Sequence, residues 1–141
     1  MSDLDTAIMI ANKAHFGQKD KSGKPYILHP LRLALKMSSQ EEQIVAVLHD
    51  VLEDSSTGVE DLKSYGFSRR VVDALACLTK QDGESYMDYI EKIKGNNLAA
   101  KIKMCDLQDN LDVTRLKLLG ESDLRRVKKY YDAFSYLRAS R

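Results

Sequence analysis

The sequence has 141 residues, of which 43% are hydrophobic and 30% are charged, which is the composition of a soluble globular protein. This composition argues against a disordered or membrane-spanning chain, and the formal net charge of +1 gives no reason to expect a nucleic-acid or membrane partner. The length predicts a single domain over residues 1–141, large enough to bury a substantial apolar core.

The compartment can be predicted from the N-terminus and the cysteines. The first residues are acidic and no long apolar run follows them, so the sequence predicts no signal peptide. Cys77 and Cys105 show no CxxC spacing and lie in apolar helical patterns, where free thiols are expected. The prediction is therefore a protein of the reducing cytoplasm.

Taken in chain order, the apolar residues repeat with helical spacing, and no segment alternates as a strand does. A polar, flexible loop over residues 17–25 follows the first helix, and Pro30 is expected at the first position of the second. The sequence predicts an all-α bundle of about seven or eight helices. They are expected at about 4–15, from Pro30, at about 44–54, from a capping box at Thr57 and Glu60 to near Gly66, from a cap at Ser68 through Leu78, at about 86–93 and 98–111, and from Ser122 or Asp123.

The most informative polar side chains lie in the segment 44–54. Read as an amphipathic helix at about 100° per residue, it places His49, Asp50, Glu53 and Asp54 on one arc of roughly 140°. No Lys or Arg lies nearby in the sequence to neutralise the three acids. Two carboxylates about 5 Å apart repel by roughly 3 kcal/mol at an effective dielectric constant near 20. The adjacent histidine favours a bound cation as the means of relieving this repulsion.

Two further residues can complete a metal site with His49 and Asp50. His29 opens the second helix, where its side chain can project into a cleft, and Asp106 lies on a polar stripe of an otherwise apolar helix. Two imidazoles and two carboxylates suit Mn²⁺, Fe²⁺ or Zn²⁺ better than Ca²⁺ and leave room for water on the metal. The order His, His-Asp and distant Asp is far more specific than any one of these residues.

This pattern of His29, His49-Asp50 and Asp106 resembles that of the HD superfamily of metal-dependent phosphohydrolases. The surrounding residues resemble the hydrolase domain of RelA/SpoT enzymes, most closely over residues 14–18, 21–30, 48–55, 78–80 and 103–110. The resemblance runs from about residue 5 to residue 136 and implies a compact helical HD domain. It leads us to expect a stand-alone small alarmone hydrolase without synthetase or regulatory modules.

The resemblance also implies an activity. It implies one Mn²⁺ held by the four metal-site residues, and hydrolysis of (p)ppGpp to GDP or GTP and pyrophosphate. Glu53 and Asp54, one turn beyond the His-Asp pair, would position the attacking water or exchange its proton. General acid–base catalysis of this kind is typically worth about 10²–10⁴-fold in rate.

Nucleotide contacts are expected from two places. Lys21 and Ser22 lie in the loop before His29, where the family contacts base and phosphate, and Asn110 lies four residues after Asp106 and could bond a ribose hydroxyl. The candidate phosphate partners are basic: Lys80, Lys101, Lys103 and Arg115.

Two departures from the RelA/SpoT pattern concern the base. Asp20 stands where many of these hydrolases have a basic residue that helps to hold guanine, and residues 106–110 lack the usual Arg and His. An adenine alarmone such as (p)ppApp, or another 3′-phosphorylated nucleotide, is therefore an alternative substrate. A third hypothesis is that the protein is not an enzyme but a non-catalytic sensor that binds an alarmone or a metal. Glu53 and Asp54 argue against the sensor, because binding alone does not need them.

Overall fold

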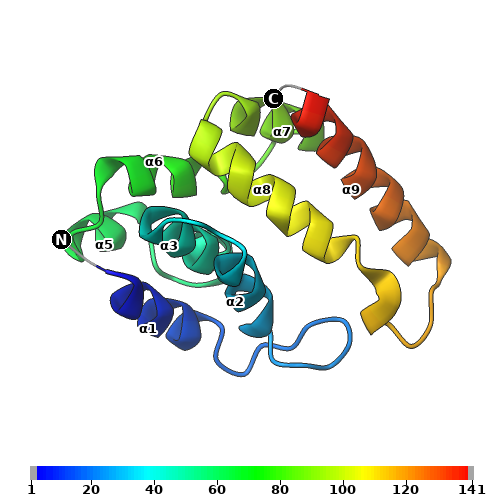
Figure 1. Cartoon of the computed structure of the whole chain (residues 1–141), viewed down its shortest axis with the longest axis horizontal. Helices are drawn as coiled ribbons and strands as arrows, with labels where there is room; N and C mark the ends of the chain where they lie inside the picture. Colours follow the sequence, from blue (N-terminus) through cyan, green and yellow to red (C-terminus); the bar gives the residue numbers. More distant parts are fainter. Residues whose placement is uncertain (1–2, 140–141) are drawn as a thin grey trace.

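The computed structural model describes residues 3–139, which contain no strand apart from an isolated bridge between Lys19 and Pro25 (Figure 1). The all-α prediction is confirmed. The helices are α1 (Leu4–Ala14), α2 (Leu28–Leu35), α3 (Gln40–Leu48), α4 (Val51–Asp54), α5 (Val59–Ser64), α6 (Arg69–Cys77), α7 (Tyr86–Lys94), α8 (Asn97–Asn110), the 3-10 helix η1 (Val113–Arg115) and α9 (Glu121–Ala139). Among the helices of residues 3–139, none combines the length and apolar character needed to cross a bilayer.

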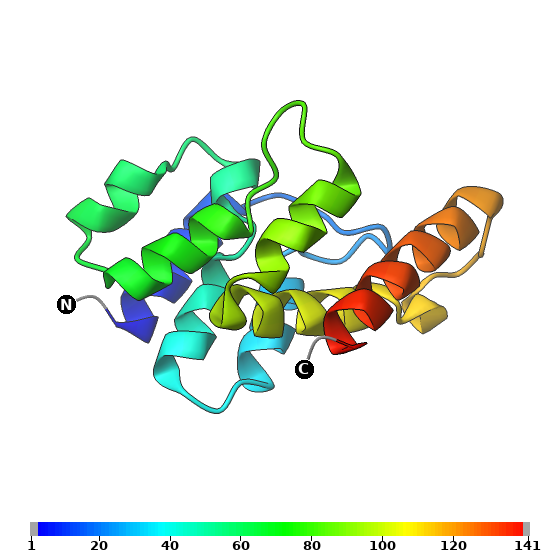
Figure 2. The same ribbon diagram turned by 90° about the horizontal axis from the view of Figure 1, so that it is seen from above.

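Helix α3 lies at the centre of the apolar core. Its last four residues, Val45 to Leu48, are fully buried, and the helix packs against α1, α2, α6 and α8. Helix α8 extends this core toward α7 and α9, and α8 and α9 run side by side (Figures 1 and 2). The core thus brings together segments that are far apart in the sequence.

The start of α3 is fixed by a capping box. The Ser39 hydroxyl accepts a hydrogen bond from the Glu42 amide at 3.2 Å, and the Glu42 carboxylate accepts one from the Ser39 amide at 3.3 Å. Lys101 on α8 donates to the same carboxylate at 2.7 Å. Glu42 therefore both caps α3 and ties it to α8.

The prediction of one continuous helix over residues 44–54 is wrong, because the helix breaks at the His-Asp pair. Helix α3 ends at Leu48 and α4 begins at Val51, with His49 and Asp50 between them. The break comes at Asp50, whose φ of −105° and ψ of 0° depart from helical values. It also explains why residues 3–139 form nine α-helices rather than the predicted seven or eight.

Helix α2 begins earlier than predicted. Its first residue is Leu28, so Pro30 occupies the third helical position and not the first. Proline is tolerated there because the first amides of a helix have no carbonyl partner within the helix. The earlier start places His29 in the first turn, with its side chain buried.

Candidate metal centre

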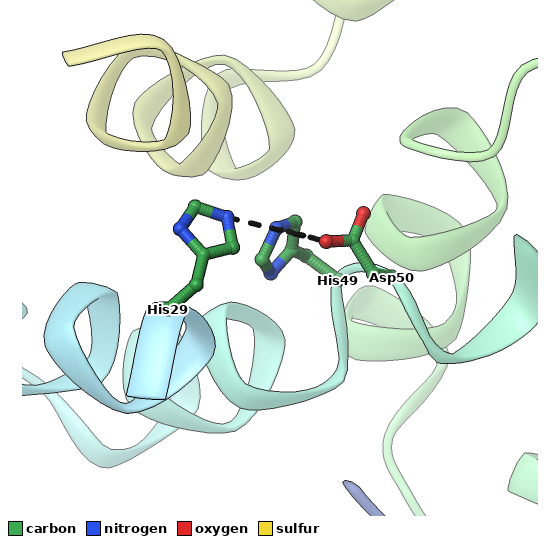
Figure 3. Close-up of side chains that lie close together, drawn as sticks. All are labelled: His29, His49 and Asp50. Carbon is green, nitrogen blue, oxygen red and sulfur yellow. Dashed lines mark ion pairs between the residues drawn. The ribbon is translucent and has the colours of Figure 1, made fainter. Parts of the chain in front are cut away.

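Three parts of the fold bring the predicted metal-site residues together. His29 comes from the first turn of α2, while His49 and Asp50 come from the break between α3 and α4 (Figure 3). One ligand atom from each of these three side chains lies within 4.8 Å of the others. The Nε2 atom of His49 is 2.9 Å from Oδ2 of Asp50, and Nε2 of His29 is 4.0 Å from the same oxygen.

Asp106 on α8 joins this group by contacting both imidazoles. Its Oδ1 atom lies 2.8 Å from Nε2 of His29 and 3.5 Å from Nε2 of His49. Lys103 donates to its other oxygen at 2.9 Å, and the Asn110 amide donates to Oδ1 at 3.1 Å. All four side chains predicted as metal ligands therefore converge on one place.

The two nitrogens of His49 have different surroundings. Nδ1 donates to the Ala46 carbonyl at 2.7 Å, which fixes the proton on that nitrogen. Nε2 is buried and makes no hydrogen bond to any group that the structure describes, although Asp50 is close. Nε2 of His49 thus faces two carboxylates and a second imidazole without a hydrogen bond of good geometry, and this mixed nitrogen and oxygen donor set fits a divalent metal.

The electrostatics of the centre are dominated by close opposite charges. Burial alone would lower the pKa of His49, but the carboxylates of Asp50 and Asp106 outweigh burial and raise it well above the usual value. Burial would raise the pKa of Asp106, whereas Lys103 and His49 hold it well below the usual value. Burial would likewise raise the pKa of Asp50, but the charge of His49 lowers it to about 2, so both carboxylates are ionised at neutral pH, as metal ligands must be.

Sequence reasoning missed Tyr26. The Tyr26 hydroxyl donates a short hydrogen bond to Oδ2 of Asp50. Its ring contacts the rings of His15 and His29, with centroid distances of 4.9 and 5.6 Å. Nothing in the spacing of the sequence distinguishes this tyrosine from a core residue, because its partner lies 24 residues away.

Asp109 was also missed, although a signal for it existed. It is 4% exposed, and its Oδ2 atom accepts a hydrogen bond from Nδ1 of His29 at 2.6 Å. The side chain is also bound by Arg32 and Arg115. Because Asp109 follows Asp106 by three residues, both carboxylates lie on one face of α8, and this spacing could have indicated it.

Glu53 and Asp54 contact different elements. Oε1 of Glu53 accepts a hydrogen bond from the Lys80 amide at 2.7 Å, and burial of Glu53 raises the pKa of its carboxyl. Oδ2 of Asp54 accepts one from the Gln18 side chain at 3.3 Å and lies 3.9 Å from Nδ1 of His15. The two acids therefore flank the centre, Glu53 beside the loop after α6 and Asp54 beside the loop after α1.

Two cavities adjoin the centre. The larger, of about 320 Å³, is lined by His29 and by four of the residues predicted to bind substrate: Lys21, Ser22, Asn110 and Arg115. The smaller, of about 200 Å³, is lined by Glu53 and by Lys80, Lys103 and Asn110. Asn110 and Tyr130, a residue of α9 that sequence reasoning missed, line both cavities.

Three of the residues discussed from the sequence have partners within the protein. Lys101 pairs with Glu42 at the start of α3 rather than lining either cavity. Asp20, at the position where a guanine contact was expected to be lost, instead accepts three hydrogen bonds within its own loop, from the amide and hydroxyl of Ser22 and the amide of Lys24. Arg115 is engaged with Asp109 and Asp112.

Comparisons with known proteins agree with this description. A solved structure of a metazoan ortholog of SpoT, described as hydrolysing ppGpp, superposes with a TM-score of 0.75 over 99% of this chain and 92% of that chain, at 21% sequence identity. The two chains therefore share the same all-helical fold.

Sequence comparison identifies relatives that are named as (p)ppGpp hydrolases. A guanosine-3′,5′-bis(diphosphate) 3′-pyrophosphohydrolase of Aquifex aeolicus is 32% identical over 139 residues, which are 90% of this chain and 20% of the relative. The bifunctional (p)ppGpp synthase/hydrolase SpoT of Escherichia coli is 33% identical over 89 residues, or 60% of this chain and 12% of the relative. The chain spans a fifth or less of the length of these relatives, and no family model matches it. The predicted resemblance to the RelA/SpoT-type HD domain is confirmed.

Proposed function

We propose that this protein is a metal-dependent hydrolase that removes the 3′-pyrophosphate from (p)ppGpp, giving GDP or GTP and pyrophosphate. The observation that carries the proposal is the convergence of two buried imidazoles, of His29 and His49, with the carboxylates of Asp50 and Asp106. The similar proteins are named for hydrolysis of ppGpp, and this supports the choice of substrate.

The metal would be held by Nε2 of both histidines and by carboxylate oxygens of Asp50 and Asp106. Mn²⁺ is our proposal for its identity, and another divalent transition ion fits the same donor set. When bound, such an ion polarises a phosphoryl oxygen and makes water a nucleophile at neutral pH. Tyr26 holds Asp50 in place through its hydroxyl.

Glu53 and Asp54 are the proposed acid–base residues. Glu53 is half-buried and its pKa is raised by burial, which brings the carboxyl closer to the operating pH where proton transfer is most efficient. The Lys80 amide fixes its orientation. Asp54 is oriented from the other side by the Gln18 amide, so the two acids can act at different points around the reacting phosphorus.

The two cavities suit different parts of the substrate. The smaller cavity holds Lys80, Lys103 and Lys129, whose positive charges suit a pyrophosphate group. The larger cavity has room for a nucleoside beside Lys21 and Ser22. Because Asn110 lines both, we propose that it contacts the ribose that joins the two parts of the substrate.

The test is a panel of purified nucleotides incubated with the protein and Mn²⁺, with and without a chelator. Metal-dependent pyrophosphate release from ppGpp is the expected result. Faster release from ppApp would assign adenine as the base, and orthophosphate release from simple nucleotides would assign a different phosphohydrolase activity. Tight binding of ppGpp without turnover would overturn the proposal in favour of a sensor.

The domain organisation, compartment and partner of the protein are also proposed from its sequence. We propose that residues 1–141 act as one domain and that the protein works in the cytoplasm, because Cys77 and Cys105 are both free thiols. A small nucleotide is the proposed partner, with no nucleic acid and no membrane.

A further inference from the structure

The imidazole of His29 is bound at both ends by carboxylates of one helix. Nε2 lies 2.8 Å from Oδ1 of Asp106, and Nδ1 lies 2.6 Å from Oδ2 of Asp109, with both acids on α8. A carboxylate can only accept a hydrogen bond, so the contact with Asp109 requires a proton on Nδ1. By the same rule Nε2 carries a proton toward Asp106 in the metal-free protein, so the proposed metal would displace the proton on Nε2 and leave the one on Nδ1.

Asp109 is itself held by two arginines. Nε and Nη2 of Arg32 donate to its two oxygens, each at 2.9 Å, in a bidentate pair, and Nη2 of Arg115 lies 3.4 Å from Oδ2. Arg32 comes from α2, one turn after His29, so a single helix supplies both the imidazole and the guanidinium that bind this carboxylate. Asp109 is 4% exposed, which leaves it little freedom to move.

A contribution to folding stability does not by itself explain these buried contacts of Asp109. A buried ion pair often contributes little net stability, because removing both charges from water costs about as much as their attraction returns. Here the same carboxylate also accepts the hydrogen bond from Nδ1 of His29, the nitrogen that faces away from the other predicted metal ligands. Carboxylates that bind the far nitrogen of a metal-bound histidine fix the ring and strengthen the ligand.

We propose that Asp109, clamped by Arg32, is a positioning residue that fixes the orientation and tautomer of His29 so that Nε2 faces the metal. The inference rests on the proposed function, because it requires His29 to be a metal ligand. Asp109 does not touch the substrate or the metal in this role. It acts through His29 alone.

The test measures Mn²⁺ affinity by calorimetry for the wild type and for Asp109→Asn, Asp109→Leu and Arg32→Met. Affinity should fall by about 10- to 100-fold when Asp109 is replaced. Asparagine, which keeps an acceptor for Nδ1, should retain more affinity than leucine, and Arg32→Met should weaken binding less than Asp109→Leu does. Glu42→Gln is the matched control, because it removes a carboxylate from an ion pair that also joins a helix to α8 but has no contact with His29, Asp106 or Asp109, and it should leave Mn²⁺ affinity unchanged.

A second readout distinguishes positioning from folding. In the Zn²⁺-loaded wild type, the ¹⁵N spectrum should show the proton of His29 on Nδ1 with a strongly hydrogen-bonded resonance, and Asp109→Leu should lose that resonance. If Asp109→Leu does not fold, Asp109→Asn and Arg32→Met decide the question.

The outcomes separate the two proposals. If the wild type binds none of Mn²⁺, Fe²⁺ and Zn²⁺, the proposed function fails. If the wild type binds Mn²⁺ but Asp109→Asn and Arg32→Met bind it equally well, only the role of Asp109 is overturned. Weaker binding with an unchanged His29 resonance would also overturn it, because Asp109 would then act without fixing the tautomer.

Discussion

Charged side chains occur in this protein in two contrasting settings. At the centre, His29, Asp106 and Asp109 are at most 5% exposed, and each contacts two or more partners from other segments. On the surface, pairs such as Lys128 with Asp132 join neighbouring turns of one helix, with side chains 79% and 56% exposed. The same chemical groups therefore serve different purposes, because burial makes each central group depend on its partners.

A substitution in the buried centre should lower the free energy of unfolding more than one in a surface ion pair. An exposed ion pair contributes about 0–1 kcal/mol, since water solvates either partner left alone. Removing one partner from a buried pair strands the other charge and costs about 3–5 kcal/mol. The centre is thus a region in which function and stability are coupled, while the surface pairs can be changed freely.

The largest effect is expected from His49→Gln. It removes the buried Nε2 ligand, so Mn²⁺ binding by calorimetry and metal-dependent turnover of ppGpp should both be lost. The matched control for Mn²⁺ binding is His15→Gln, because His15 is an equally buried histidine that lies outside the four-residue centre. It is not a control for turnover, because His15 lies beside Asp54. Retained Mn²⁺ binding in His49→Gln, or equal loss in His15→Gln, would contradict the assignment of the centre.

Glu53→Gln should have the next largest effect. The amide keeps the size of the side chain but cannot take a proton, so turnover of ppGpp should fall by about 10²–10⁴-fold, whereas Mn²⁺ affinity should not change. Asp54→Asn is measured beside it, and the variant with the larger loss identifies the main proton-transfer residue. Loss of Mn²⁺ affinity in Glu53→Gln would instead make Glu53 a part of the metal site.

Leu75→Ala separates stability from function. Leu75 on α6 is fully buried in the apolar core, and its truncation should lower the free energy of unfolding by about 2–5 kcal/mol in chemical denaturation. Because Leu75 lies outside the charged centre, Mn²⁺ affinity of the folded fraction should match the wild type. A parallel loss of affinity would show that the centre depends on general packing rather than on its own contacts.

Glu42→Gln should have a smaller effect that depends on pH. The hydrogen bonds and ion pair of Glu42, chiefly with Lys101, lower its pKa from the ordinary 4.5 to about 2 in the folded protein. Its carboxylate therefore stabilises the fold above pH 4.5, and this contribution is lost as the pH falls toward about 2. The substitution should cost about 1 kcal/mol at pH 7 in denaturant titrations.

The cost of Glu42→Gln should decrease on acidification through that range. The surface change Asp132→Asn is the reference and should stay within about 0.5 kcal/mol of the wild type. A cost for Glu42→Gln that is independent of pH would mean that its side chain acts by packing rather than by charge.

Much of the centre follows from the sequence. Helical spacing of apolar residues predicts the all-α fold, and the order of His29, His49-Asp50 and Asp106 predicts the four residues that the structure brings together. The break between α3 and α4 escaped prediction, because the same apolar spacing continues across Asp50 and only its backbone angles end the helix. Periodicity describes which residues share a face and does not detect a local change of backbone conformation.

The amino-acid sequence by itself determined that the chain is helical and which side chains are candidates for the chemistry, because both depend on residue type and short-range spacing. Only the tertiary structure decided how those side chains are held. His29 meets Asp109 across 80 residues of sequence, and Asp50 meets Tyr26 across 24. Such contacts arise from the packing of α2, α3 and α8 around one core, which no local pattern encodes. The same packing directs Glu53 and Asp54, neighbours in the chain, toward different partners.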